Sequence, residues 1–385
     1  MPTPAVNTRS CFGSGSDSNT PSGPLTLGEK ASLYGLTYGG GPRNNGTAYE
    51  LTPGSGGSWT ERILHAFVGG SDGAIPWGGV ILDSAGDLYG TVHGDVGVDV
   101  GGVFELSLGS SGWSNTVLYS DDAGPGLVFD KLGNLYGEIG PGSYFHIGAI
   151  GELSRGSHGW TYTDLFNFNP TVGYGPPAPP IWDGKGNLFG TTTDGGISQP
   201  KCWTSSGCGV IFEMTPNRDG TWTYHILHRF ASFPDDGQSP SGGLVMDASG
   251  NLYGVTGGLG GAHKNGTVFK FTPSTDGRWK QTVLYDFPNC ANGCYPFGTL
   301  AFDKAGNLYG AGDGGVADCQ GYTCGVIFKL TPQKNGSWNY SVLHRFNGAD
   351  GAFPWGVILD DKGNIFGTTE NGGKYNAGVA FEITP

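Results

Sequence analysis

The sequence contains no apolar run that approaches the length of about 18 residues needed to span a membrane, so it predicts no transmembrane helix. Its first residues, Met-Pro-Thr-Pro, lack the apolar stretch of a signal peptide, as would a processed secreted protein with an added Met. No phosphate-binding loop, dinucleotide fingerprint, Gly-x-Ser-x-Gly elbow or His-Glu-x-x-His motif occurs. A kinase, a serine hydrolase and a zinc protease therefore have no motif support.

Basic residues are scarce, because 20 Lys and Arg stand against 33 Asp and Glu, for a net charge of −13. An acidic surface repels phosphate backbones, so we expect no nucleic-acid partner, although solubility is the simpler role of this charge. Glycine is abundant, with 74 of 385 residues, but it follows no strict Gly-X-Y period, which excludes collagen. The glycines gather at turns between apolar runs, a pattern typical of tight hairpins.

A five-residue motif recurs seven times along the chain. It reads Gly-Asn-Leu-Tyr-Gly at residues 133–137, 250–254 and 306–310, with close variants at 31–35, 86–90, 186–190 and 363–367. The copies are 47 to 64 residues apart. A repeat of this period predicts one repetitive domain over residues 1–385.

Each repeat contains four strand-like runs, which the fifth repeat illustrates. They cover residues 242–247, 251–256, 266–273 and 279–287, and we name them A to D in that order. Apolar and polar residues alternate in them with a period of two. Four strands in each of seven repeats predict an all-β fold, a seven-bladed β-propeller of four-stranded blades.

The two ends of the sequence complement each other. The last repeat stops after its third strand, at residues 378–385, and so lacks an outer strand. Residues 5–12 are spaced from the first motif as strand D is spaced in other repeats, although Pro4 stands where those repeats carry Trp. We therefore predict that an N-terminal strand completes the last blade.

Several charged residues recur in the repeats and are interpreted as structural. Asp begins six of the seven A-to-B turns, where its side chain caps turn amides. A charged residue occupies one place in every strand C, and His65, His228 and His344 share one place in strand D that aromatic residues fill elsewhere. Residues that occur in every blade serve the blade, so we assign them no metal or catalytic role.

The repeat reads G-G-L-V-x-D-x-x-G-N-L-Y-G-T-T, then G-V-F-E-L-T-P, then W-x-x-x-V-L-H-x-F. This pattern resembles the GloVer-type tandem-repeat proteins over nearly the whole chain. The resemblance implies a secreted or surface-anchored bacterial propeller, with any anchor outside this sequence, and it carries no general activity. We expect a monomer without a membrane span.

Six of the seven cysteines form three close pairs, Cys202/Cys208, Cys290/Cys294 and Cys319/Cys324. Paired cysteines in loops indicate disulfides and an oxidising compartment. The alternative is a zinc site made by the last two pairs, whose spacing is only loosely zinc-like. Cys11 is left over.

Function is expected where the D-to-A and B-to-C loops open around the axis, on the face that we name the channel mouth. These loops are irregular, whereas the A-to-B turns of the opposite face are uniform, and variable loops on a rigid scaffold commonly carry function. His, Tyr and carboxylate side chains that break the repeat there are suited to acid–base cleavage of a sugar chain, although an ordinary loop residue is the simpler interpretation of any one of them. The candidate catalytic residues are His93, Tyr144, His146 and Tyr174.

The candidate substrate-binding residues are aromatic or basic. Trp77 and Trp355 follow a Pro near the channel mouth, where they would stack on sugar rings or pack blade against blade. Arg43, His263 and Lys264 lie in B-to-C loops, and the two basic side chains would meet an acidic sugar.

A group of carboxylates crowds the channel mouth near blades 2 and 3. These are Asp95, Asp99, Asp121 and Asp122. Calcium binds such oxygen-rich sites, so a Ca²⁺ ion is compatible with this group, but no cofactor is required.

Two functions remain open from the sequence. One is a secreted enzyme, a lyase or glycoside hydrolase, that acts on an extracellular polysaccharide or oligosaccharide. The other is a non-catalytic carbohydrate- or protein-binding scaffold. We place the ligand toward blades 2, 3 and 4, where the short D-to-A loop at residues 120–125 would lower the rim.

Overall fold

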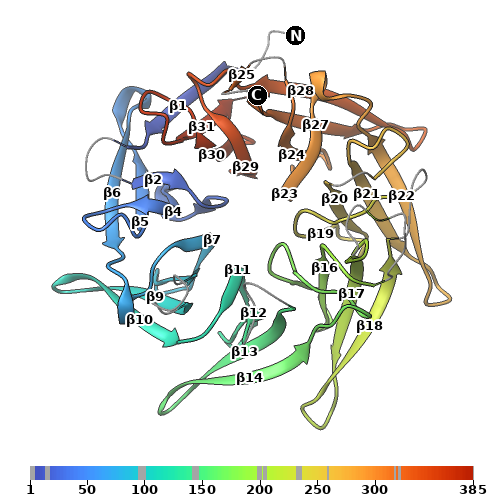
Figure 1. Cartoon of the computed structure of the whole chain (residues 1–385), viewed down its shortest axis with the longest axis horizontal. Helices are drawn as coiled ribbons and strands as arrows, with labels where there is room; N and C mark the ends of the chain where they lie inside the picture. The colour runs from blue at the N-terminus through green and yellow to red at the C-terminus, as the bar shows by residue number, and fades with distance from the viewer. Residues whose placement is uncertain are drawn as a thin grey trace.

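The computed structural model describes residues 5–13, 18–93, 101–140, 147–196, 202, 206–230, 236–257, 260–315, 318–319 and 322–384. In these residues seven antiparallel sheets form blades in a ring around a central axis (Figure 1). Each blade has strands A to D from the axis outward. The predicted seven-bladed β-propeller is therefore confirmed.

The strands follow the chain blade by blade. Blade 1 consists of β2 (Ser18–Pro21) with the short β3 (Thr26–Leu27), β4 (Leu33–Gly40), β5 (Thr47–Pro53) and β6 (Trp59–Ala66). Blade 2 consists of β7 (Pro76–Leu82), β8 (Leu88–Val92), β9 (Gly102–Gly109) and β10 (Gly112–Tyr119). Blade 3 consists of β11 (Ala123–Phe129), β12 (Leu135–Ile139), β13 (Ala149–Gly156) and β14 (Gly159–Asn167). Blade 4 consists of β15 (Ile181–Trp182), β16 (Leu188–Thr192), β17 (Val210–Pro216) and β18 (Trp222–Arg229).

The remaining blades have the same order. Blade 5 consists of β19 (Val245–Met246), β20 (Leu252–Thr256), β21 (Thr267–Pro273) and β22 (Trp279–Asp286). Blade 6 consists of β23 (Cys294–Phe302), β24 (Leu308–Asp313), β27 (Val326–Pro332) and β28 (Trp338–Arg345), and its B-to-C loop holds β25 (Asp318–Cys319) and β26 (Tyr322–Thr323). Blade 7 consists of β29 (Ala352–Leu359), β30 (Ile365–Asn371), β31 (Val379–Thr384) and the N-terminal β1 (Ala5–Cys11).

Strand β1 closes the ring, as predicted. It pairs antiparallel with β31, from Ala5 opposite Thr384 to Cys11 opposite Val379. Arg9 Nη2 lies 2.6 Å from Glu382 Oε2, and Arg9 Nη1 donates to the Gly57 carbonyl of blade 1 at 2.8 Å. The first strand of the chain is thus held by the last strand and by the neighbouring blade.

The recurring Asp of the A-to-B turns has the structural role predicted for it. In blade 2, Asp83 Oδ1 accepts hydrogen bonds from the Ala85 N–H at 2.9 Å and the Asp87 N–H at 3.0 Å. The other five turns that begin with Asp repeat both bonds. The carboxylate of each Asp therefore caps the backbone N–H groups of its own turn.

The charged residue of strand C also serves the blade. Tyr89 of the repeat motif lies opposite Glu105 and donates to it at 2.7 Å. In blade 5 the charge is Lys270, whose Nζ lies 5.5 Å from the centroid of the Tyr253 ring, and Tyr253 donates to Asp247 instead. Either sign of charge finds a partner in the same Tyr, so the structural interpretation is confirmed.

Aromatic pairs seal six of the seven blade junctions. A ring that follows strand D packs against a ring of strand C in the next blade, with centroids 5.1 to 5.6 Å apart. The pairs are Phe12–Tyr49, Phe67–Phe104, Phe168–Phe212, Phe230–Phe269, Phe287–Phe328 and Phe346–Phe381. The junction between blades 2 and 3 carries Asp121 and Gly151 at these two places. This junction is the structural exception in the ring.

Candidate functional site

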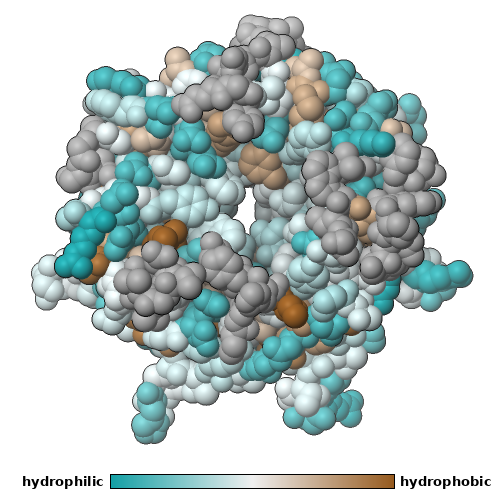
Figure 2. Space-filling view, viewed as in Figure 1, coloured by the Kyte–Doolittle hydropathy of each residue, from teal (hydrophilic) through white to brown (hydrophobic). Residues whose placement is uncertain are grey.

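Residues of all seven blades, in the innermost strand or beside it, surround a cavity of about 310 Å³ on the propeller axis. Figure 2 shows an opening at the centre of the molecule. The described lining contains Trp77, Phe297 and Trp355, with many prolines and glycines and no charged side chain. The cavity therefore offers aromatic and apolar surface beside backbone polar groups.

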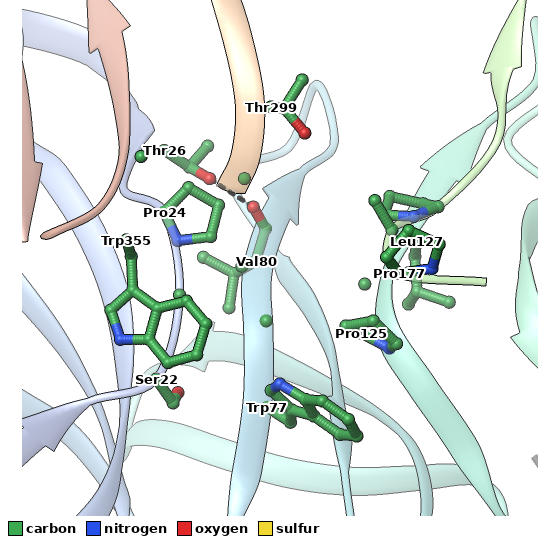
Figure 3. Close-up of a pocket in the computed structure, with 18 of the residues that line it drawn as sticks. Ser22, Pro24, Thr26, Trp77, Val80, Pro125, Leu127, Pro177, Thr299 and Trp355 are labelled. Carbon is green, nitrogen blue, oxygen red and sulfur yellow. Dashed lines mark hydrogen bonds between the residues drawn. The ribbon is translucent and has the colours of Figure 1, made fainter. Parts of the chain in front are cut away.

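Trp355 is held between three blades. Its Nε1 donates to the Pro21 carbonyl of blade 1 at 2.8 Å. Its ring centroid lies 6.4 Å from that of Tyr38 in blade 1 and 6.3 Å from that of Phe297 in blade 6. The indole is half-buried and lies on the cavity wall with Trp77 (Figure 3). Its orientation is thus fixed before any ligand arrives.

Trp77 packs against the predicted catalytic residue His93. The two rings, from β7 and the end of β8, are edge to face with centroids 4.7 Å apart. Only 6% of His93 is exposed, and burial lowers the pKa of its imidazole to about 4. At neutral pH His93 is therefore uncharged beside the aromatic wall.

One register position at the end of strand B gathers chemically different side chains around the channel mouth. It lies three residues after the last glycine of the repeat motif. Burial raises the pKa of Asp313 to about 6, and burial also raises the pKa of Glu370. Neither carboxyl group was among the candidates predicted from the sequence, although both break the repeat at this position when the seven repeats are aligned. The seven residues are Tyr38, His93, Gly140, Thr193, Gly257, Asp313 and Glu370.

The rim of the channel mouth is rigid in most blades. In five blades, where the chain enters or approaches strand A, a non-glycine residue before a Pro adopts a φ of +41° to +60°, a conformation that costs on the order of 1 kcal/mol or more. In each, the N–H donates to a carbonyl of the preceding blade, as Ile75 does to Asn45 at 2.8 Å. The entry to blade 3 has no such residue, because only residues 120–122 join β10 to β11. This connection is the shortest of the D-to-A loops, as predicted, but residues 123–125 of the predicted loop lie in β11.

The family model of the Gloeobacter/Verrucomicrobia repeat matches this chain twice, at residues 2–202 and 202–385. The chain belongs to the Gloeobacter/Verrucomicrobia repeat family. The resemblance drawn from the repeat pattern is thereby confirmed. Among curated proteins no match is found.

Solved structures of other proteins share the fold of this Gloeobacter/Verrucomicrobia repeat protein at low sequence identity. An ancestral GH74 enzyme aligns with a TM-score of 0.62 and 12% identity, over 99% of this chain and 51% of that chain. A puromycin hydrolase aligns with a TM-score of 0.53 and 13% identity, over 91% and 50%. A candidate 6-phosphogluconolactonase from Bacteroides fragilis aligns with a TM-score of 0.51 and 15% identity, over 92% and 89%. The chain spans about half the length of the first two, and the likeness shows the propeller fold.

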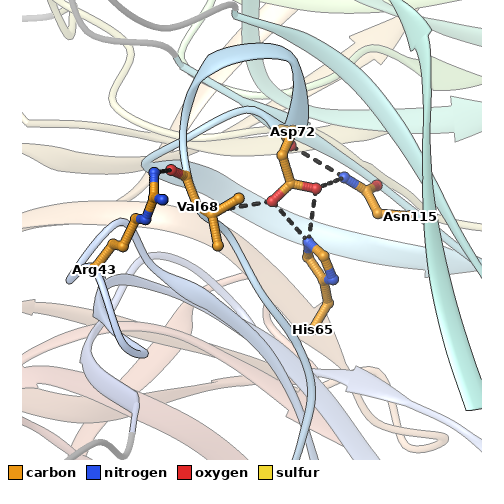
Figure 4. Close-up of polar contacts among 5 residues, drawn as sticks. All are labelled: Arg43, His65, Val68, Asp72 and Asn115. Carbon is orange, nitrogen blue, oxygen red and sulfur yellow. Dashed lines mark hydrogen bonds and ion pairs between the residues drawn. The ribbon is translucent and has the colours of Figure 1, made fainter.

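The other predicted binding residues, and the predicted catalytic residue Tyr174, lie outside the cavity lining. Arg43 is exposed and its Nη1 donates to the Val68 carbonyl at 3.1 Å (Figure 4). His263 Nδ1 lies 2.6 Å from Asp286 Oδ2, and exposed Lys264 has a φ of +63°. Tyr174 is half-buried against the core of blade 4, and its backbone exchanges two hydrogen bonds with Asp194. The structure therefore places Trp77 and Trp355 in the cavity lining, with His93 buried against Trp77, and leaves these four residues apart from the cavity.

The recurring His of strand D pairs with an Asp of the D-to-A loop that follows it. His65 Nε2 lies 3.0 Å from Asp72 in the D-to-A loop, and Asp72 also accepts from the Val68 N–H and from Asn115 of blade 2 (Figure 4). His228–Asp236 and His344–Asp350 repeat the pair, each at 3.0 Å. Each pair ties a D-to-A loop to its own blade, so the structural interpretation is confirmed.

Part of the predicted site lies outside the described residues, namely Tyr144, His146, Asp95 and Asp99. Asp121 is exposed, and its Oδ1 accepts from the Asp122 N–H at 2.8 Å. Within the described ranges no group of three His, Cys, Asp or Glu residues is placed to hold a metal ion. The proposed four-carboxylate Ca²⁺ site stays a prediction.

The three close cysteine pairs are disulfides, Cys202–Cys208, Cys290–Cys294 and Cys319–Cys324, as predicted. Cys11 is the free cysteine. Three disulfides indicate an oxidising environment. Among the described residues, no helix has the length and apolar character to cross a membrane.

Proposed function

We propose that the protein binds an extracellular carbohydrate at the channel mouth, with Trp77 and Trp355 as stacking surfaces. The observation that carries this proposal is the aromatic lining of the axial cavity without a charged side chain. Aromatic rings suit the apolar faces of sugar rings, and a few polar groups orient such a ligand. The proposal rests on this lining rather than on the fold likeness to the GH74 enzyme.

Pre-organisation of the two indoles supports binding. Trp355 is fixed by its hydrogen bond to Pro21, and Trp77 by its contact with His93. A ligand would therefore lose little binding free energy to ordering these side chains. Backbone groups of Gly78, Gly298 and Gly356 lie in the same lining and would meet sugar hydroxyls.

A hydrolase that cleaves the bound polysaccharide is the second candidate. Asp313 and Glu370 take the same register position in neighbouring blades, on the side where Trp355 lies. Glycosidic cleavage requires an acid whose pKa is raised toward neutral pH, and burial raises the pKa of Asp313 to about 6. The lyase alternative would use the neutral imidazole of His93 as its base.

The binding proposal is tested on a panel of neutral and acidic polysaccharides by affinity electrophoresis and calorimetry. We expect Trp355→Ala to weaken binding about tenfold or more, because a central aromatic contact is lost. The matched control is Tyr375→Ala, which removes an exposed aromatic residue from the B-to-C loop of blade 7. Equal affinity of wild type and Trp355→Ala for every bound polysaccharide would refute the channel mouth as the binding site.

The same panel separates the catalytic and non-catalytic functions. New reducing ends indicate a hydrolase, and absorbance from an unsaturated product indicates a lyase. Hydrolysis that Asp313→Asn and Glu370→Gln abolish while binding persists supports the carboxyl pair. Binding without either product assigns the protein as a non-catalytic carbohydrate-binding propeller.

A further inference from the structure

Blade 3 contains a buried carboxyl group at a position where no other blade has one. Glu138 lies in β12 at a position where the other blades carry Leu36, Thr91, Thr191, Val255, Ala311 and Thr368. Only 4% of Glu138 is exposed, and its Oε1 has no hydrogen-bond partner among the described residues. A buried carboxylate oxygen without a partner is unfavourable, so the site calls for a positive ion or a proton.

A second carboxylate shares the same face of the blade. Ala123 pairs with Ile139, and the Gly140 N–H donates to the Asp122 carbonyl at 3.1 Å. Because side chains alternate between the faces of a sheet, Asp122, Glu138 and Gly140 lie on one face. The negative charge of Asp122 and burial both raise the pKa of Glu138 well above its usual range. Asp122 therefore lies on the face of Glu138, opposite Gly140 and one diagonal position away across the strand pair.

Glycines leave room around these carboxyl groups. A Cβ built on Gly124 would lie 2.1 Å from Glu138 Oε2, and one built on Gly148 would lie 2.3 Å from Glu138 Oε1. Any other residue at either position would displace the carboxyl group.

We propose that Asp122 and Glu138 bind a divalent cation of the Ca²⁺ type at the channel-mouth end of blade 3. An all-oxygen ligand set suits Ca²⁺, which also accepts backbone carbonyls and water. Glu138 is the anchor of this site, and it was absent from the four carboxylates predicted from the sequence. The site is independent of the proposed carbohydrate function, because neither residue lines the axial cavity.

The proposal is tested by calorimetric titration of EDTA-treated protein with CaCl₂, and by Tb³⁺ luminescence. Tyr162 is a sensitiser beside the site, because its hydroxyl donates to the Ile139 carbonyl at 3.2 Å. We expect saturable binding of Ca²⁺ and a rise in Tm on its addition. Glu138→Gln should weaken Ca²⁺ binding by at least about tenfold, and Asp122→Asn should weaken it similarly.

The matched control is Glu370→Gln, which removes another carboxyl group of raised pKa at the channel mouth, in blade 7. It should leave Ca²⁺ binding unchanged. Absence of saturable Ca²⁺ binding by the wild type would overturn the proposal, because Glu138 would then be a buried protonated acid. Unchanged affinity in both Glu138→Gln and Asp122→Asn would also overturn it. Asp122→Asn keeps the test decisive if Glu138→Gln fails to fold.

Discussion

At the scale of the residue, burial of Asp313 disfavours the ionised form of its carboxyl group. Burial raises the pKa of its carboxyl group from 3.8 to about 6. The unfolded carboxyl group therefore ionises first as the pH rises, and the folded state holds more protons between about pH 4 and pH 6. The free energy of unfolding must fall through this window, and the deficit persists at neutral pH.

Replacement of Asp313 by Asn should stabilise the protein at pH 7 and have little effect at pH 4. The shift corresponds to roughly 3 kcal/mol, reduced to about 2 kcal/mol because the residue is partly exposed. Urea unfolding of both proteins at the two pH values measures this difference. A variant with the same pH dependence as wild type would show that Asp313 does not cause it. Stability given up at one residue is expected where that residue serves function.

At the scale of the element, Asp72 holds the D-to-A loop between blades 1 and 2 in place through its hydrogen bonds. Its carboxylate accepts from His65, from the Val68 N–H and from Asn115 of the next blade. We expect Asp72→Ala to lower the free energy of unfolding by about 2 kcal/mol, because three donors, two of them partly buried, lose their acceptor. Chemical unfolding measures this loss.

The control for Asp72 is Asp361→Ala. Asp361 pairs with Lys304 at 3.0 Å, but the two side chains are 97% and 80% exposed. Water replaces such a pair at little cost, so the change should stay within about 0.5 kcal/mol. Equal losses in the two variants would contradict the role assigned to the Asp72 network.

At the scale of the whole molecule, ring closure depends on β1, which is the first strand of the chain and the outer strand of the last blade. Without β1 (Ala5–Cys11), strand β31 becomes an unpaired edge, and Glu382 loses Arg9. Deletion of residues 1–11 should prevent a stable monomer, since the loss is comparable with the marginal stability of about 5–15 kcal/mol of a folded protein. An exposed edge strand also promotes aggregation.

Size-exclusion chromatography and thermal unfolding test the deletion. Removal of residues 1–4 alone is the control, because it leaves β1 intact. A monomeric deletion variant with a wild-type Tm would contradict the role of β1 in ring closure.

The repeat allowed the architecture to be predicted because the information is local and redundant. Seven copies of one hairpin motif specify seven strand pairs, and a missing outer strand at one end matches a spare strand at the other. The turn role of Asp83 and its equivalents also followed from local chemistry, since their partners lie two and four residues away. Cysteine pairs separated by four to six residues were predictable for the same reason.

The functional residues depend on neighbours that are distant in sequence. Trp355 is oriented by Pro21 and Tyr38, more than 300 residues away, and no local pattern reveals this contact. The sequence around Glu138 is typical of an ordinary strand. Only the tertiary structure shows that Gly124, Gly148 and Asp122 surround its carboxyl group. The sequence by itself determined the ring of blades, because strand periodicity and turn chemistry both depend on residues only a few positions apart. The burial and charge of individual side chains at the channel mouth arose only when the ring closed, because they depend on which blades become neighbours.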